Sequence, residues 1–324
     1  MRGLQRLAVL VMSFLIVCAA ANAGHAQSDY PNRPVRIIIG FIPGSAADIT
    51  ARVLGSRLGQ ILGQQFVIET KPGAGSSLAA DFSAHAPADG YTLFLGSSAN
   101  ITNSAINPKL TDISKDLAPI ALATTAPVIL VVHPSTGVNN LQELIALAKL
   151  KPGEVLYAST GVGTAPHLSA ELFAMRAGVK LVHVPYQGSP QAVIDLLAGR
   201  TMMMFSPASA VISQVEAGKL KALASAAAKR PAVAPNIPTM AEAGMPDFDT
   251  SIWFGLMAPL GTQREVIDKL ARTLREAQQS SEVLTALRTQ GFDMISGGPD
   301  EFTRMMQSET KRWSEVATAA GLKK

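Results

Sequence analysis

Short apolar runs alternate with amphipathic helical patterns along most of this chain. Between most of the runs, apolar residues recur at helical spacing, as Ile49, Val53, Leu54 and Leu58 do after the first run. This alternation predicts an α/β protein whose parallel sheets are covered by helices on both faces. The runs that have the length and apolar content of buried strands are residues 35–39, 66–69, 92–95, 128–132, 155–158, 181–184, 201–205 and 220–224.

The segment 41–48, which reads FIPGSAAD, joins the first predicted strand to the first predicted helix. Pro43 and Gly44 shape a tight turn, and Ser45 stands where a helix N-cap belongs. The first N–H groups of a helix have no intrahelical partner, and the macrodipole makes that end partly positive. Such an end can hold a carboxylate or a phosphate without a basic side chain. The same residues also fit an ordinary strand-to-helix turn that binds nothing.

A second unit of the same kind spans residues 156–167, LYASTGVGTAPH. A strand again ends in a glycine-rich, uncharged loop that opens a helix. Two such loops, far apart in the sequence, predict two lobes that face one ligand. His167 can either reach that ligand or hydrogen-bond the loop, whereas His183, in an apolar run, is expected to be a core histidine with a satisfied ring.

Two strand-like apolar segments, 126–134 and 252–259, end in proline, which suits the ends of strands better than their centres. We expect the chain to cross between lobes near these segments. The predicted first lobe is then 27–125 together with 255–324, and the second lobe is 126–254.

Residues 1–26 are typical of an export signal peptide. Arg2 and Arg6 form a positive start, an apolar run covers 7–17, and small residues follow up to the preferred cleavage site after Ala26. Cys18 is the only cysteine and would leave with the signal, while the bulky Val17 before it argues against lipid attachment. We therefore expect a soluble protein of the periplasm with no thiol and no disulfide.

Charge and motifs exclude several classes of function. Loss of Arg2 and Arg6 lowers the formal charge from +4 to +2, and aromatic residues make up only 5%, so nucleic acid is not an expected partner. The sequence contains no Gly-x-Ser-x-Gly elbow, no P-loop and no complete dinucleotide fingerprint. None of the five histidines pairs with another at metal-ligand spacing. We expect no catalytic residues, no metal and no cofactor.

Several short strings, in this order and spacing, resemble the solute-binding proteins of tripartite tricarboxylate transporters, also called the Bug family. The likeness covers essentially the whole mature chain. The strings are FIPG with Asp48, KPGAG at 71–75, PADGYTL at 87–93, YAS at 157–159 with the glycine-rich loop up to Leu168, HVPYQG at 183–188, AGKL at 217–220, Pro238-Thr239 with EAG at 242–244, and WFGL at 253–256.

The resemblance implies a periplasmic binding protein of type II-like fold, with two α/β lobes and a ligand cleft between them. It also implies capture of a small carboxylate, largely by backbone N–H groups, and delivery to the membrane subunits of a tripartite tricarboxylate-type transporter. Carried over by position, the ligand-binding residues are Pro43, Gly44, Ser45, Ala46, Ala47, Asp48, Ser97, Ser98, Asn100, Ser159, Thr160, Gly161, Gly163, Thr164, His167, Tyr186, Gln187, Gly188, Ser206 and Ser209.

These loops contain no Lys or Arg, and Asp48 stands in a first helical turn, where a carboxylate caps the helix. Ser206 stands where the family often has Asp. An ammonium group would therefore find no partner, and we expect a carboxylate ligand without an amino group, such as a dicarboxylate. We expect a monomer. Two alternatives stay open: a component that presents ligand to a membrane sensor kinase, and a secreted enzyme that pairs His167 with Ser159 or Thr160.

Overall fold

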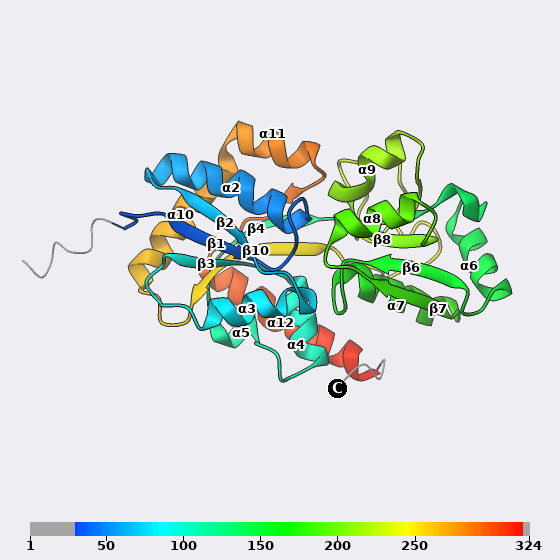
Figure 1. Ribbon diagram of the computed structural model, residues 1–324, viewed down its shortest axis with the longest axis horizontal. Helices are drawn as coiled ribbons and strands as arrows, with labels where there is room; N and C mark the ends of the chain where they lie inside the picture. The colour runs from blue at the N-terminus through cyan, green and yellow to red at the C-terminus, as the bar shows by residue number, and fades with distance from the viewer. Residues whose placement is uncertain (1–29, 320–324) are drawn as a thin grey trace, which may run out of the picture.

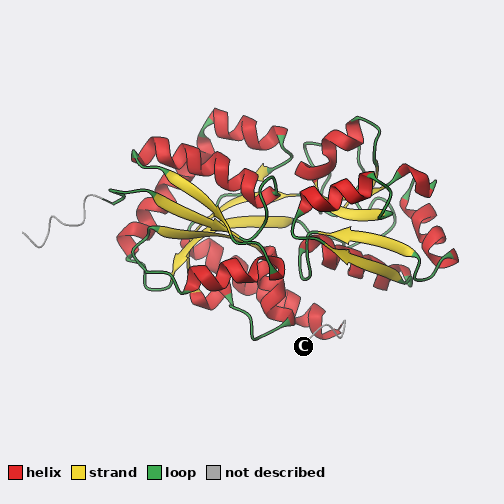
Figure 2. Cartoon of the chain, in the orientation of Figure 1, coloured by secondary structure: helices red, strands yellow, loops and turns green. Residues whose placement is uncertain are grey.

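Two lobes lie side by side, each built from a β-sheet with helices on its faces (Figure 1). The computed structural model describes residues 30–319, so the predicted signal peptide with Cys18 lies outside the described residues. Strands occupy the centre of each lobe and helices its outside (Figure 2). Within residues 30–319, no helix is long and apolar enough to cross a membrane.

The first lobe contains a six-stranded sheet in the order β11-β4-β10-β3-β1-β2. Helices α2, α10 and α11 lie on one face of this sheet, and α3, α4, α5 and α12 lie on the other (Figure 1). The strands are β1 (Val35–Ile39), β2 (Phe66–Thr70), β3 (Thr92–Ser97), β4 (Leu117–Ala126), β10 (Ile252–Pro259) and β11 (Asp293–Met294). The helices are α2 (Ala46–Leu62), η1 (Ala74–Ser76), α3 (Ser77–Ala84), α4 (Ser98–Ile106), α5 (Ile113–Asp116), α10 (Arg264–Gln279), α11 (Ser281–Thr289) and α12 (Pro299–Ala319).

The second lobe contains a five-stranded sheet in the order β7-β6-β8-β5-β9. Helices α8 and α9 pack on one face, and α6 and α7 pack on the other. The strands are β5 (Val128–Val132), β6 (Val155–Ser159), β7 (Leu181–Pro185), β8 (Met203–Pro207) and β9 (Lys221–Ser225). The helices are η2 (Pro134–Thr136), α6 (Leu141–Leu150), α7 (Ala165–Ala177), α8 (Ser189–Leu197) and α9 (Ala208–Glu216).

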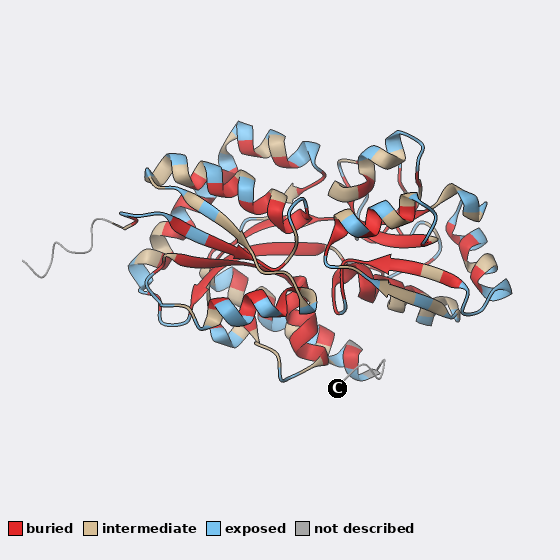
Figure 3. Ribbon diagram, viewed as in Figure 1, coloured by how far each residue is buried: buried red, intermediate tan, exposed pale blue. Residues whose placement is uncertain are grey.

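Burial explains why the strands read as continuous apolar runs. Every residue of β5, β8 and β10 is buried, because helices cover both faces of the sheets (Figure 3). Met203 and Met204, the first two residues of β8, are fully buried in the core.

Both sheets are mixed, so the prediction of parallel sheets was wrong in part. β1 runs parallel to β2 and β3, and β6 runs parallel to β7 and β8. However, β10 is antiparallel to β3 and β4, and β5 is antiparallel to β8 and β9. Strand–helix alternation sets the direction only within β-α-β units. The exceptions are the strands next to the connections between the lobes, where no helix intervenes.

The chain leaves the first sheet at Ala126 and enters the second at Val128, with only Pro127 between them. It returns after β9 through residues 226–251 and re-enters the first sheet as β10. We propose that the lobes, with the predicted boundaries 27–125 plus 255–324 and 126–254, move as separate units.

The eight predicted strands are confirmed, with bounds displaced by at most two residues, as for the run 201–205, which corresponds to β8. The ten-residue strand β4 was missed. Its sequence is rich in Ala and Thr and contains Pro119, which argues against a central strand. β11 pairs with β4 only at Thr124 and Thr125, so β4 is an edge strand at Pro119, beside an irregularity in its pairing with β10.

Candidate functional site

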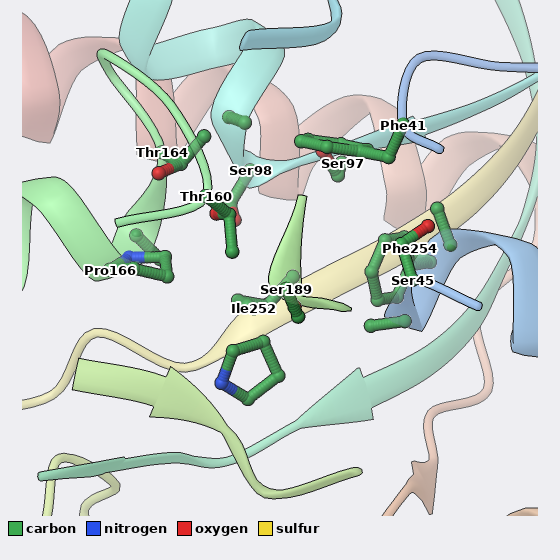
Figure 4. Close-up of a pocket in the computed structure, with 15 residues that line it drawn as sticks. Phe41, Ser45, Ser97, Ser98, Thr160, Thr164, Pro166, Ser189, Ile252 and Phe254 are labelled. Atoms are coloured by element: carbon green, nitrogen blue, oxygen red, sulfur yellow. The ribbon is translucent and has the colours of Figure 1, made fainter. Parts of the chain in front are cut away.

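A cavity between the lobes is lined by the starts of five helices (Figure 4). Helices α2 and α4 come from the first lobe, and α7, α8 and α9 come from the second. The space between the lining atoms, counted out to open solvent, is about 360 Å³. The lining residues are Phe41, Ser45, Ala46, Ala47, Ser97, Ser98, Ala99, Thr160, Thr164, Ala165, Pro166, Ser189, Pro207, Ile252 and Phe254.

The topology of the two sheets brings these helix starts together. Each of the five helices follows the carboxyl end of a strand, namely β1, β3, β6, β7 and β8. Parallel strands place their carboxyl ends at one edge of the sheet, and the helices that follow start there. The edges of the two sheets face one another, so the positive ends of five helix dipoles border the cavity without a charged side chain in its lining.

The turn into α2 is held together by its own side chains. Ser45 is the N-cap, and its hydroxyl accepts the Asp48 N–H at 3.4 Å. The Asp48 carboxylate accepts the Gly44 N–H at 2.9 Å and pairs with the Arg52 guanidinium at 2.9 Å. Asp48 thus caps the turn, as predicted, and it does not line the cavity. The Ser45 N–H donates to the Ile42 carbonyl at 3.2 Å, so this N–H group is already paired within the turn.

The turn into α4 presents a hydroxyl without a protein partner. Asn100 ties the turn together, because its side chain accepts the Ser97 N–H at 3.1 Å and donates to the Ser76 carbonyl at 3.2 Å. Ser98, the first residue of α4, is only 4% exposed and lines the cavity. Its Oγ is buried and has no hydrogen-bond partner among residues 30–319. A buried hydroxyl without a partner is costly, so a ligand atom is its natural partner.

The turn into α7 reaches both the cavity and the other lobe. Thr164 is the N-cap, and its hydroxyl donates to the Gly161 carbonyl at 2.7 Å. Gly161 in turn donates its N–H to the Ser159 hydroxyl at 3.1 Å. The carbonyl of Gly163 accepts a hydrogen bond from the Thr102 hydroxyl of α4, which joins the two lobes.

Two stacked histidines lie behind this turn. The rings of His167 and His183 have centroids 4.3 Å apart, and the ring of Tyr157 stacks on His183 at 4.8 Å. Burial lowers the pKa of His167 to about 4. Burial and then the nearby His167 lower the pKa of His183 to about 4, although Glu171 opposes the shift. Both rings are therefore neutral near pH 7.

The structure decides between the alternatives for His167. Its Nδ1 accepts the Gly163 N–H at 3.2 Å, so His167 hydrogen-bonds the loop and does not line the cavity. The ring of His183 is satisfied, as expected, because its Nε2 lies 2.6 Å from the Ser159 hydroxyl. The pairing of His167 with Ser159 or Thr160, which the enzyme alternative would need, is not formed. The Ser159–His183 pair does not line the cavity, and Ser159 is fully buried.

The predicted site residues fall into three groups. The first group lines the cavity and consists of Ser45, Ala46, Ala47, Ser97, Ser98, Thr160 and Thr164. The second lines a neighbouring hollow between the lobes, which shares Phe41 and Thr160 with the cavity, and adds Gly161, Tyr186 and Gln187. The third lines neither space and consists of Pro43, Gly44, Asp48, Asn100, Ser159, Gly163, His167, Gly188, Ser206 and Ser209.

Sequence reasoning missed several lining residues, most of them apolar. Phe41 and Phe254 belong to strings that the resemblance already singled out. Ser189 opens a helix that has Pro in its first turn, which is a signal of a helix start. Their approach to one cavity depends on contact between the lobes, which local patterns do not show. The missed lining residues are Phe41, Ala99, Ala165, Pro166, Ser189, Pro207, Ile252 and Phe254.

The family model of the tripartite tricarboxylate transporter family receptor matches residues 50–322 of the chain. The chain belongs to this family. Protein BugT of Bordetella pertussis is 37% identical over 316 residues, which cover 97% of this chain and 97% of BugT.

Solved structures agree with this family and with its two-lobed periplasmic-binding-protein fold. The periplasmic binding protein BugD superposes with a TM-score of 0.87 at 29% identity, covering 91% of this chain and 99% of BugD. The R. palustris protein Rpa4515, solved with adipate, superposes with a TM-score of 0.87 at 34% identity, covering 90% of this chain and 99% of Rpa4515. Among the residues described here, no group of three His, Cys, Asp or Glu side chains could hold a metal ion.

The lowered histidine pKa values predict a loss of stability in mild acid. Between about pH 6.5 and pH 4 the unfolded chain binds protons at His167 and His183 that the folded chain does not bind. The free energy of unfolding therefore falls as the pH falls through this window. We expect the wild type to lose on the order of 1–3 kcal/mol more than a His167→Asn/His183→Gln double variant, measured by urea unfolding at both ends of the window.

His85→Asn, at the C-cap of α3 and with its side chain 78% exposed, is the matched control and should lose as much stability as the wild type. Parallel losses in the wild type and the double variant would contradict this prediction.

Proposed function

We propose that this protein is an extracytoplasmic solute-binding protein that captures a small carboxylate without an amino group between its lobes. The observation that carries the proposal is the convergence of five helix N-termini on a cavity whose lining contains no charged side chain. In this proposal, the protein then delivers the ligand to the membrane subunits of a tripartite tricarboxylate-type transporter, which is the role of the receptors of its family.

The electrostatics of the cavity favour an anion. Unpaired N–H groups and partly positive helix ends attract a carboxylate, and they act strongly in a site that is mostly shielded from water. Hydrogen bonds to a charged group contribute roughly 1.5–3 kcal/mol each, so a few of them account for a useful affinity. The structure of Rpa4515 with adipate supports a carboxylate as the ligand class.

The same lining disfavours an ammonium group. Asp48, in the first turn of α2 next to three lining residues, has its carboxylate already shared between the Gly44 N–H and the Arg52 guanidinium. Ser206, where an Asp would offer a negative charge, is fully buried and directs its hydroxyl to the Pro207 carbonyl. An amino acid would thus bring a positive charge next to helix N-termini with no compensating anion, which costs affinity.

Apolar side chains form the remaining wall of the cavity. Phe41, Ile252 and Phe254 contribute carbon surface from the first lobe and from the strand that returns to it. Pro166 and Pro207 contribute carbon surface from the second lobe. The carbon backbone of an aliphatic or aromatic dicarboxylate would pack against this surface while its oxygens face the helix ends.

The other features of the proposal follow from binding and delivery. We propose that the protein acts as a monomer, carries no cofactor, catalyses no reaction and reaches the periplasm through the predicted signal peptide 1–26. Its family and its structural neighbours are receptors and binding proteins, which supports a role in binding.

A ligand panel tests the proposed function. We expect adipate, malate or phthalate to raise the melting temperature at pH 7.5, because a ligand of the native state adds about 2.7 kcal/mol of stability at a hundredfold excess over its dissociation constant. Glutamate and aspartate, which carry the same carboxylates plus an ammonium, should have little effect. Stabilisation by the amino acids but not by the dicarboxylates would overturn the proposal.

A serine substitution tests the role of the unpaired hydroxyl. Ser98→Ala should weaken binding of the best ligand of the panel about tenfold, because it removes one hydrogen bond to a charged group. It should leave the unliganded protein as stable as the wild type, since Ser98 Oγ has no protein partner within the described chain.

The matched control is Ser104→Ala in the same helix. The Ser104 hydroxyl donates to the Ile101 carbonyl at 3.0 Å, and Ser104 lies outside the lining of the cavity. Isothermal titration calorimetry should find wild-type affinity for Ser104→Ala. Equal affinities for Ser98→Ala and the wild type would show that the ligand does not use this hydroxyl.

A further inference from the structure

The loop 160–164 links the cavity to the contact between the lobes. Thr160 and Thr164, at its two ends, line the cavity. Between them, the Gly163 peptide lies against α4 of the other lobe, where the Thr102 hydroxyl donates to its carbonyl. The fit is close, because a Cβ on Gly163 would lie 1.7 Å from the side-chain oxygen of Asn103. The position of Gly163 therefore affects both the lining of the cavity and the contact between the lobes.

The imidazole of His167 holds the backbone N–H of Gly163. His167 Nδ1 lies 3.2 Å from the Gly163 nitrogen and accepts its N–H. A backbone N–H can only donate, so Nδ1 must be unprotonated and the ring proton must lie on Nε2. The backbone of Gly163 is thus held from the first lobe through its carbonyl and from the second lobe through its N–H, which belong to consecutive peptide groups.

The neighbouring histidine supports the same loop. His183 Nε2 lies 2.6 Å from the Ser159 hydroxyl, which accepts the Gly161 N–H at 3.1 Å. The stacked rings of His167 and His183 therefore lie behind two of the peptides of the loop. Two positive charges at this spacing would repel one another strongly, so the arrangement disfavours protonation of both rings at once.

Few charged or titratable groups face the pair. Glu171, one turn further along α7, lies 4.0 Å from His167 Nε2, and its carboxylate accepts the Tyr157 hydroxyl at 2.5 Å. The ring of Tyr157 stacks on the ring of His183. α4, which packs against the loop from the other lobe, contributes Thr102 and Asn103, which do not titrate. No carboxylate among these groups faces Nδ1, the atom on which a second proton would reside.

We propose that His167 is a positioning residue, whose unprotonated Nδ1 holds the Gly163 peptide in the position that lets the loop 160–164 meet both the ligand and the first lobe. This inference rests on the proposed function for its effect on ligand affinity, although the contact itself exists without ligand. Protonation of the ring places a hydrogen on Nδ1, opposite the Gly163 N–H. Two donors then face one another, the hydrogen bond is lost and the loop is released from its position against α4. Burial keeps the ring neutral at pH 7, because it lowers the pKa of His167 to about 4.

The first test uses the full-length mature protein without ligand. Nitrogen NMR of the imidazoles should show His167 as the Nε2–H tautomer, and the ring should titrate near pH 4. The amide resonance of Gly163 should shift with the same midpoint, and a His85→Asn control should leave both titrations unchanged. An Nδ1–H tautomer, or a Gly163 amide that does not respond to the titration of His167, would overturn the proposal.

The second test separates the hydrogen bond from the ring itself. The side-chain oxygen of His167→Asn falls close to the position of Nδ1 and can accept the Gly163 N–H without titrating, whereas His167→Leu removes the acceptor. We expect His167→Asn to bind adipate within about threefold of the wild type at pH 7.5, and His167→Leu to bind about tenfold more weakly. As the pH falls towards 4, the affinity of the wild type should fall relative to that of His167→Asn. The comparison at each pH cancels the titration of adipate itself.

The outcomes distinguish this inference from the proposed function. Equal adipate affinities for the Asn and Leu variants, or a ratio of wild type to His167→Asn that does not change with pH, would overturn the positioning role while leaving the proposed function intact. If the wild type binds neither adipate nor any other carboxylate of the panel at pH 7.5, the proposed function fails. In that case the positioning role of His167 is tested by the NMR titration of the Gly163 amide, which needs no ligand.

Discussion

The first N–H groups of a helix cannot be paired within that helix, and the site of this protein depends on this constraint more than on any side chain. Five helices begin around one cavity because five strands end there. The cavity is thus positive through backbone geometry while its lining carries no charge. Side chains refine this arrangement. Ser45, Asp48 and Asn100 accept hydrogen bonds from backbone N–H groups in the turns. The buried hydroxyl of Ser98 has no partner among the described residues.

Close contact between the lobes is the second requirement, and small residues make it possible. A Cβ on Gly163 or on Gly188 would strike Asn103 or Ile42 of the opposite lobe, at 1.7 Å and 2.9 Å respectively. Both glycines have φ values, +75° and +157°, that other residues rarely adopt. The described arrangement is therefore one in which the lobes meet around the cavity. The hydrogen bonds of the Gly163 carbonyl and N–H connect that contact with the loop 160–164, whose two ends line the cavity.

Local patterns predicted the elements well and their contacts less well. The run 35–39, the helix start at Ser45 and the glycine-rich turn before α7 could be predicted because apolar spacing, capping and turn chemistry are properties of short segments. The antiparallel direction of β10 and the strand β4 could not, because they depend on which segments pair across the sheet. Phe254 and Ser189 reach the cavity only because the lobes meet. The partner of His167 was undecided between ligand and loop, because its Nδ1 meets Gly163 only once the path of the loop is known.

The central claim is that helix N-termini from both lobes hold a carboxylate without help from a basic side chain. A crystal structure of the protein grown with adipate tests it most directly. The account predicts a carboxylate in the cavity, with oxygens within about 3.2 Å of N–H groups or hydroxyls at the starts of helices from both lobes, Ser98 among them. A carboxylate paired with Arg or Lys, or adipate bound outside the cavity between the lobes, would contradict it.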